Sequence, residues 1–297
     1  PMLHAMIMAG GGGTWFWPRS RVKRPKQFLT FAGDRTLLQG TLDRIAPQVP
    51  PERTWVITGE PHVPEAKVQL PEVPADRFVG EPMGRDTAAA IGLGAALIAS
   101  TDPAATMIVM PADHVIEPAR EFQRAVHAAE QFANEYPNAL LTFGIPPTFP
   151  STGYGYIQRG GVIGQRQNVT ASKVAAFREK PNADLAEQFL ASGEYFWNSG
   201  IFVWKAATIL GELRKHRPKL FASIARIAEA WPTPDRDAVF RQEFETIEKV
   251  SIDYAVMEHA TDAMVIQAPY QWDDVGSWLA LERRNPQDAD GNTVQGT

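Results

Sequence analysis

A short apolar run that ends in four consecutive glycines is the feature that most constrains the fold of this chain. Residues 3–9 are apolar apart from His4, and Gly10–Gly13 follow them directly. An apolar run of this length predicts a buried strand, and glycines allow the backbone behind it conformations that other residues avoid. A buried strand that leads into such a loop is typical of the start of an α/β nucleotide-binding fold.

Amide groups in this loop can approach a ligand closely and direct several N–H donors at phosphate oxygens. The functional interpretation is therefore that the loop binds phosphate, with Ala9, Gly10, Gly11, Gly13 and Thr14 as the candidate nucleotide-binding residues. No Gly-Lys-Ser/Thr follows, so the loop is not a P-loop, and it lacks the third spaced glycine of a dinucleotide fingerprint. A mobile turn is the alternative interpretation, and the glycines alone favour neither.

The composition excludes several classes of protein. The 297 residues are 44% hydrophobic and 21% charged, which suits one large α/β domain or two modest ones. The net charge of −5 comes without a basic stripe, which argues against nucleic acid as a partner. The absence of cysteine excludes disulfides and thiolate chemistry and fits the cytoplasm. The apolar stretch 88–99 is shorter than the roughly 20 residues of a membrane span, so no membrane partner is expected.

Helical and strand patterns alternate through the first half of the chain. Helices are expected at 36–45, 86–100 and 120–132, and strands at 54–58, 106–110 and 140–144. This alternation predicts a largely parallel sheet. After residue 145 short strands follow one another across glycine-rich turns, which indicates an inserted subdomain. There the pattern predicts strands at 154–158, 173–177, 201–204 and 263–268, and helices at 182–191, 206–215, 219–230 and 252–259.

Two stretches behind the glycine loop place cations beside it. Residues 17–21 are Trp-Pro-Arg-Ser-Arg, and residues 24–29 are Arg-Pro-Lys-Gln-Phe-Leu. With the loop, they resemble the signature of the sugar-nucleotide pyrophosphorylases, and Pro-Lys-Gln-Phe-Leu resembles its mannose-1-phosphate guanylyltransferase branch. The resemblance implies that Lys26 binds nucleotide phosphates. Arg21 is either a second phosphate ligand or a solvated surface cation.

One position departs from the family signature. Trp15 follows Gly-Thr where the family carries an arginine, which in relatives holds the departing pyrophosphate. An indole offers one neutral donor, whereas a guanidinium offers a charged fork of donors. This substitution predicts weaker catalysis unless another cation, Arg19 or Arg21, takes over the role.

Two acids, Asp113 and Asp274, match the family's metal-binding positions. Asp113 lies in Met-Pro-Ala-Asp-His at 110–114, just past a predicted strand, where open α/β sheets bind ligands. Asp274 lies one residue before a hydrophobic–glycine pair, which selects it over Asp273, interpreted as a turn or helix cap. The resemblance implies that both bind Mg²⁺, which prefers one or two carboxylates plus phosphate oxygens and water. Lys26, Asp113 and Asp274 are therefore the predicted catalytic residues, whereas His114 either orients Asp113 or packs.

Residues 80–88 resemble the family segment that lines the purine pocket. The resemblance implies that the nucleotide contacts Glu81, Pro82, Arg85 and Thr87. A carboxylate or a backbone carbonyl can accept the N1–H and N2–H donors of guanine, which makes Glu81 and Pro82 the candidates for base recognition. Read without the family, Asp86 and Thr87 are an ordinary helix N-cap.

Three later segments, 152–157, 177–181 and 197–202, resemble the sugar side of the family. They imply that the sugar phosphate binds Gly155, Glu179, Lys180 and Asn198. Carboxylate and amide groups suit sugar hydroxyls, and a lysine suits the phosphate. Residues 251–258 also match the guanylyltransferase branch. We interpret that segment as mainly structural, with Asp253 as a helix cap.

The resemblance covers residues 2–284 and implies a Rossmann-like nucleotide-diphospho-sugar transferase fold with a mixed, mainly parallel sheet. Its nucleotide-binding part would span about 2–145 and its inserted sugar-binding part about 146–284, while 285–297 would begin a truncated C-terminal segment. The implied reaction joins GTP and α-D-mannose 1-phosphate into GDP-mannose and pyrophosphate with Mg²⁺, and a homodimer is compatible with it. Two alternatives stay open, a hexose-1-phosphate nucleotidyltransferase of other specificity and a non-catalytic GDP-mannose-binding regulator.

Overall fold

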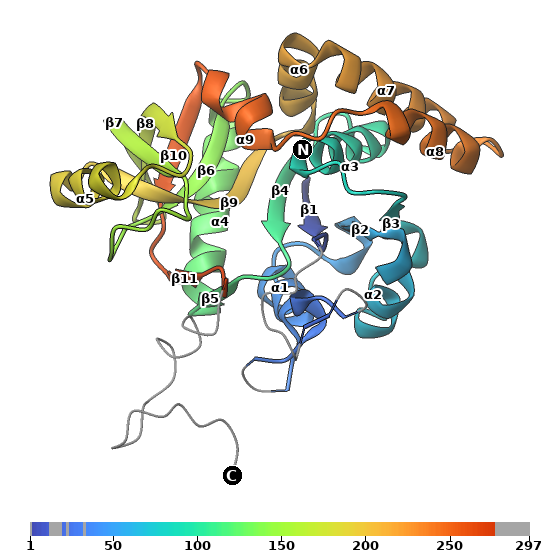
Figure 1. The fold of residues 1–297 in the computed structure, drawn as a ribbon, viewed down its shortest axis with the longest axis horizontal. Coiled ribbons are helices and arrows are strands. Elements are labelled where there is room, and N and C mark those ends of the chain that lie inside the picture. The colour runs from blue at the N-terminus through green and yellow to red at the C-terminus, as the bar shows by residue number, and fades with distance from the viewer. Residues whose placement is uncertain (1, 12–19, 22–23, 32–33, 277–297) are drawn as a thin grey trace.

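A nine-stranded sheet runs through the molecule and separates its helices into two layers (Figure 1). The computed structural model describes residues 2–11, 20–21, 24–31 and 34–276. In spatial order the strands are β3 (Phe78–Glu81), β2 (Thr54–Gly59), β1 (Leu3–Met8), β4 (Thr106–Pro111), β9 (Tyr195–Lys205), β6 (Leu140–Ile145), β10 (Ala263–Gln267), β8 (Val169–Arg178) and β7 (Tyr156–Arg166). A separate two-stranded sheet pairs β5 (Val115–Glu117) with β11 (Gln271–Asp273).

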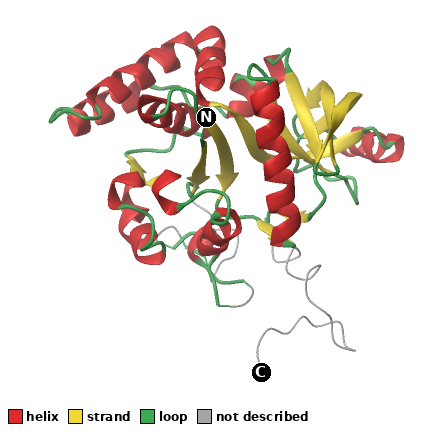
Figure 2. Cartoon of the chain, turned by 180° about the vertical axis from the view of Figure 1, so that it is seen from behind, coloured by secondary structure: helices red, strands yellow, loops and turns green. Residues whose placement is uncertain are grey.

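The helices cover both faces of this sheet, and the long helix α4 lies over the face seen in Figure 2. They are α1 (Leu37–Ile45), α2 (Val63–Gln69), α3 (Thr87–Thr101), α4 (Ala119–Glu135), α5 (Ala183–Ser192), α6 (Ala206–His216), α7 (Pro218–Ala230), α8 (Arg236–Thr246) and α9 (Ile252–Ala255). Among the described residues, none of these helices combines the length and apolarity needed to cross a lipid bilayer.

Strand β1 shows why the central strands are apolar throughout. Ala5 and Ile7 belong to the core cluster on the side of α1 and α4, whereas Met6 belongs to the cluster on the side of α3, α6 and α7. Successive side chains of a strand point to opposite faces, so a strand buried on both faces reads as one apolar run. The predicted strand at the start of the chain is confirmed.

The expected mixed α/β sheet is also confirmed. Strands β3, β2, β1 and β4 are parallel, which is the half expected to bind the nucleotide. Strand β9 comes from the later part of the chain but lies between β4 and β6, antiparallel to both. The two predicted parts of the chain therefore share one sheet.

The expected helix at 252–259 is shorter than predicted. Helix α9 ends at Ala255, and residues 257–259 form a separate 3₁₀ turn. Val256 separates them with φ −134° and ψ −54°, outside the helical region. Helices α2 and α8 were not predicted. Helix α8 is mostly polar and has only two buried residues, Phe240 and Phe244, so its sequence shows little helical periodicity.

Gly144 lies at an irregular step in the pairing of β6 with β9, where the backbone packs against side chains on both sides. A Cβ added there would lie 2.6 Å from the Phe196 Cβ and 2.6 Å from a Val265 methyl. We expect Gly144→Ala to lower the free energy of unfolding by about 1–3 kcal/mol through overpacking, measured by urea denaturation. Gly161→Ala, on β7 with nothing within 4 Å of the added Cβ, should be neutral or slightly stabilising. Equal effects of the two substitutions would contradict this account.

Candidate active site

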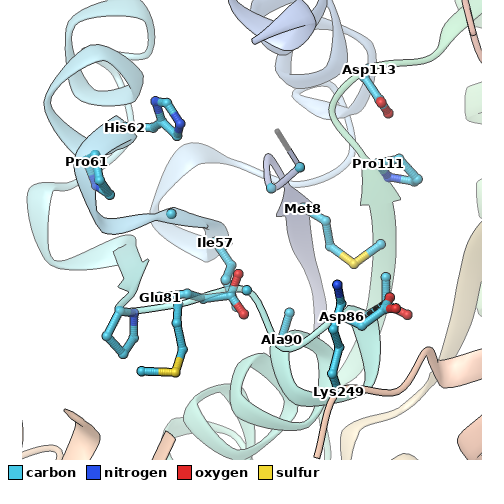
Figure 3. Close-up of a pocket in the computed structure, with 17 residues that line it drawn as sticks. Met8, Ile57, Pro61, His62, Glu81, Asp86, Ala90, Pro111, Asp113 and Lys249 are labelled. Carbon is cyan, nitrogen blue, oxygen red and sulfur yellow. Dashed lines mark hydrogen bonds between the residues drawn. The ribbon is translucent and has the colours of Figure 1, made fainter. Parts of the chain in front are cut away.

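Two adjoining cavities lie at the carboxyl ends of the parallel strands, where open α/β sheets bind ligands. The larger has a volume of about 650 Å³ and the smaller about 210 Å³. Met8, Thr87 and Pro111 line both. Figure 3 shows the larger cavity, with Met8 and Pro111 contributed by the ends of β1 and β4.

The start of the glycine loop lies where the sequence predicted. Gly10 and Gly11 line the larger cavity, and Gly11 has φ +102°, a backbone conformation that L side chains rarely adopt. Ala9 is buried instead, and its carbonyl accepts hydrogen bonds from Gln27 Nε2 and Thr58 Oγ1, both at 2.8 Å. These two bonds hold the end of β1 in place. The other predicted loop residues, Gly13 and Thr14, lie outside the described residues, as does Trp15.

Glu81 contributes a buried carboxylate to the wall of the larger cavity (Figure 3). Burial, and to a smaller extent the Asp86 carboxylate, raises the pKa of Glu81 to about 8. Its Oε1 atom is buried and has no hydrogen-bond partner among the described residues. A buried acceptor without a partner is costly, so this atom is suited to a ligand that brings N–H donors.

The loop that follows Glu81 keeps only part of its predicted contacts. Pro82 and Thr87 line the larger cavity, as a nucleotide-binding role requires. Asp86 caps α3 with its side chain, which accepts from Thr87 N at 2.8 Å, as predicted. Arg85 is absent from both cavity walls. Its guanidinium donates to the carbonyls of Phe244 at 3.0 Å and Glu245 at 2.6 Å, so it fastens the loop to the end of α8.

Lys26, Asp113 and Asp274 lie together, as predicted. The buried Lys26 Nζ is 2.8 Å from Asp113 Oδ2 and donates to the backbone carbonyl of Asp274 at 2.8 Å. Strands β5 and β11 explain how the two acids meet, because Val115 pairs with Asp273 in this small antiparallel sheet. Asp113 lines the larger cavity and Asp274 the smaller.

His114 joins the segments that carry these two acids. Its Nδ1 accepts a hydrogen bond from Trp272 Nε1 at 3.1 Å, and the two rings pack edge to face. Burial lowers the pKa of His114, so the ring is neutral near pH 7 and its proton is assigned to Nε2. That nitrogen is 3.7 Å from Asp113 Oδ1, beyond hydrogen-bond distance. His114 therefore mainly packs.

Around Asp274 the structure adds one contact that the sequence did not indicate. The Tyr154 hydroxyl donates to Asp274 Oδ1 at 2.8 Å. Tyr154 was noticed only as part of the segment 152–157, and only the fold shows that its ring reaches β11. Asp273 accepts from Val275 N at 2.7 Å, which confirms its predicted role in a turn. In the part of the chain that the structure describes, no group of three or more His, Cys, Asp or Glu side chains could hold a metal alone.

The smaller cavity contains most of the predicted sugar residues. Gly155, Glu179 and Asn198 line it. A Cβ at Gly155 would collide with the Glu179 carboxylate, so glycine leaves room for that group. Burial raises the pKa of Glu179, and the neighbouring Lys180 opposes this shift. Lys180 is absent from the cavity wall. Its side chain is 64% exposed, and its Nζ lies 4.0 Å from Glu179 Oε1.

The predicted role of Asp253 as a helix cap is wrong. The N-cap of α9 is Ser251, whose hydroxyl accepts from Tyr254 N at 3.3 Å. Asp253 lies within the first turn of α9, and its carboxylate lines the smaller cavity and accepts from Asn198 Nδ2 at 2.9 Å. Lys249, which precedes α9 in the chain, lines the larger cavity. A lone lysine in a polar loop carries no signal that could have identified it.

Comparison with known proteins shows the family of this chain. The profile of the family described as nucleotidyl transferase matches residues 4–291. The chain belongs to the nucleotidyl transferase family. It is similar to mannose-1-phosphate guanylyltransferase of Escherichia coli (strain K12), with 42% identity over 301 residues that cover 99% of this chain and 62% of that protein. A Klebsiella pneumoniae protein of the same name is 42% identical over 299 residues, with the same coverage. This nucleotidyl transferase chain thus spans about 62% of the length of the curated relatives it matches.

A solved structure shares the fold of this nucleotidyl transferase. It is the crystal structure of a Thermus thermophilus protein named mannose-1-phosphate geranyltransferase, and it matches with a TM-score of 0.83 and 35% identity. The match covers 97% of this chain and 80% of that one. The fold class expected from the resemblance is therefore confirmed.

Glu81 gives a test of the larger cavity in the absence of ligand. A carboxyl whose pKa rises from 4.5 to about 8 on folding favours the protonated form when folded. Its stabilising contribution is complete below about pH 4.5 and is lost as the pH rises to about 8. Because glutamine stays neutral, Glu81→Gln should gain stability over the unmodified protein across this window, by up to about 1.4 kcal/mol per pH unit. Urea denaturation at a series of pH values measures the difference, and a difference independent of pH would contradict the burial argument.

Proposed function

We propose that this nucleotidyl transferase transfers GMP from GTP to α-D-mannose 1-phosphate, forming GDP-mannose and pyrophosphate. One observation carries the proposal. Asp113 lines the larger cavity, Asp274 lines the smaller, and the Lys26 ammonium bonds to both residues. A cation that bonds to the Asp113 carboxylate and to the Asp274 backbone, at the junction of two pockets, suits transfer of a nucleotidyl group from a ligand in one pocket to a ligand in the other. The guanylyltransferase names of relatives 42% identical to this chain support the choice of substrates.

The larger cavity would hold GTP. Its volume of about 650 Å³ lies in the range of small-molecule sites. The glycine loop and Lys26 would contact the phosphates, while the unpartnered Glu81 Oε1 would accept N–H donors from guanine. Adenine offers an acceptor at N1 where guanine offers a donor, so a carboxylate at this position favours guanine.

The smaller cavity would hold the hexose, within a sugar-binding part that we place at about 146–284. Glu179 and Asn198 supply an acceptor and an amide for sugar hydroxyls. Lys180 would have to turn from its exposed position to meet the sugar phosphate. We place the reaction in the cytoplasm, because a chain without cysteine fits a reducing compartment.

The residues also suit Mg²⁺ as the cofactor. Asp113 and Asp274 would hold it, because two carboxylates completed by phosphate oxygens and water are a donor set that Mg²⁺ prefers. Bound Mg²⁺ would neutralise negative charge on the reacting phosphates. The Tyr154 hydroxyl keeps the Asp274 carboxylate oriented, and the Trp272–His114 bond keeps the two acid-bearing segments together.

The chain's part in the chemistry would be positioning and charge neutralisation. A sugar-phosphate oxygen forms a bond to the α-phosphorus of GTP as the bond to pyrophosphate breaks on the opposite side. The Lys26 ammonium, which pairs with Asp113, would offset the charge that moves onto the departing group. No covalent enzyme intermediate or strong general base is needed.

Pyrophosphate release from GTP, mannose 1-phosphate and Mg²⁺ tests the proposal. We expect turnover by the unmodified chain and a loss of about a hundredfold or more in kcat for Asp113→Asn, by analogy with removal of one group that stabilises a transition state. Asp184→Asn, an exposed change on α5, is the matched control and should keep full activity. If GDP-mannose binds but only a Trp15→Arg variant releases pyrophosphate, the chain is a binder and the proposal fails.

Base selection gives an independent test of the larger cavity. Glu81→Gln should lower kcat/KM for GTP by about tenfold to a hundredfold, since the amide replaces one oxygen that can accept from guanine with an NH₂ group that can only donate. The value for ATP should change little, so the preference for GTP over ATP narrows. An equal loss with both nucleotides would assign Glu81 a structural role only.

A further inference from the structure

The segment 251–258, which its sequence indicates is mainly structural, contributes a side chain to the smaller cavity. Asp253 projects from α9 into the cavity that also contains Glu179 and Asn198. Ser251 already caps this helix, so the Asp253 carboxylate is not needed there. Burial and the nearby Glu179 carboxylate raise the pKa of Asp253 to about 7. A carboxylate kept in such surroundings without a capping role needs another explanation.

The hydrogen bonds of Asn198 show one consequence of this carboxylate. Asn198 Oδ1 accepts from the backbone N–H of Gly200 at 3.3 Å and from Thr142 Oγ1 at 3.2 Å. Because the Gly200 N–H can only donate, the oxygen end of the amide must face it. Asp253 Oδ1 accepts from Asn198 Nδ2 at 2.9 Å and holds the other end. The Gly200 N–H and the Asp253 carboxylate therefore fix the amide together, and Asp253 holds its N–H end on its own side of the cavity.

Besides Asp274, the cavity consequently holds the carboxylates of Glu179 and Asp253 and one amide donor around a single small space. Gly155 leaves the space open, because a side chain there would meet Glu179 and Asn198. Each carboxylate oxygen can accept more than one hydrogen bond, so Asp253 can keep Asn198 and still accept from a ligand hydroxyl. Neighbouring ring hydroxyls of a hexose can donate to two such acceptors and accept from the amide between them.

We propose that Asp253 is a specificity-determining residue of the sugar cavity, which accepts a hydrogen bond from one ring hydroxyl and orients the Asn198 amide toward the same ring. The inference rests on the proposed function, since the ligand is the hexose 1-phosphate of that reaction. It extends the function by assigning sugar selection to a segment near the end of the described chain.

A comparison that combines the Asp253→Ala variant with deoxy sugars tests this role. The probes are mannose 1-phosphate and its 2-, 3-, 4- and 6-deoxy analogues, and the readouts are pyrophosphate release and direct binding by calorimetry. Asp253→Ala should raise KM and Kd for mannose 1-phosphate by about tenfold to a hundredfold, as expected for a lost bond to a charged group, while KM for GTP is unchanged. One deoxy analogue should bind the unmodified protein more weakly than mannose 1-phosphate does. For that analogue Asp253→Ala should cause no further loss of affinity, because the hydroxyl that Asp253 would contact is already absent.

Two further variants keep the comparison interpretable. Tyr254→Phe is the matched control, because Tyr254 is an exposed neighbour on α9 and should behave like the unmodified protein with every sugar. Asp253→Asn keeps the size of the side chain and, should the alanine variant not fold, is expected to change the order of preference among the same analogues. A uniform loss with all sugars and with GTP, or Asp253→Ala behaviour equal to Tyr254→Phe, would overturn the inference. Absence of pyrophosphate release by the unmodified protein would instead overturn the proposed function, and calorimetry would still report on Asp253.

Discussion

The Lys26 ammonium is the group around which the two cavities are joined. It forms an ion pair with Asp113 and a hydrogen bond to the backbone of Asp274, two residues from distant parts of the chain. A buried ammonium is stable only when its donors are satisfied, so the segment after β4 and the segment after β11 must both reach it. The short β5–β11 sheet and the Trp272–His114 bond serve the same end by fixing these acid-bearing segments to each other.

A second connection runs from α8 to α9 along the wall of both cavities. Arg85 fastens the loop that follows Glu81 to the end of α8. Ala88 N donates to the Val250 carbonyl at 3.2 Å, and Ile252 N donates to Thr87 Oγ1 at 2.8 Å. Thr87 lines both cavities. The segment that brings Lys249 to one cavity and Asp253 to the other is therefore bonded directly to the loop expected to bind the base.

Much of the fold could be predicted because its signals are local. The β1 pattern, the capping of α3 by Asp86 and the turn at Asp273 depend on neighbours within a few positions. Errors arose where distant residues decide. The expected helix at 252–259 breaks at Val256, and Arg85 bonds to carbonyls of α8, a helix too polar to be recognised from its own pattern.

By itself the sequence determined the strand that leads into the glycine loop, the alternation that makes an α/β sheet, and which lysine and acids resemble those of a known family. These depend on short-range geometry and on residue chemistry, both of which are properties of the chain in order. Only the tertiary structure decided that Asp253 faces a cavity rather than capping a helix, that Tyr154 reaches Asp274, and that Arg85 bonds to α8 instead of lining a cavity. Such contacts depend on strand register and packing between segments far apart in sequence, where a displacement of one residue would move every side chain to another face.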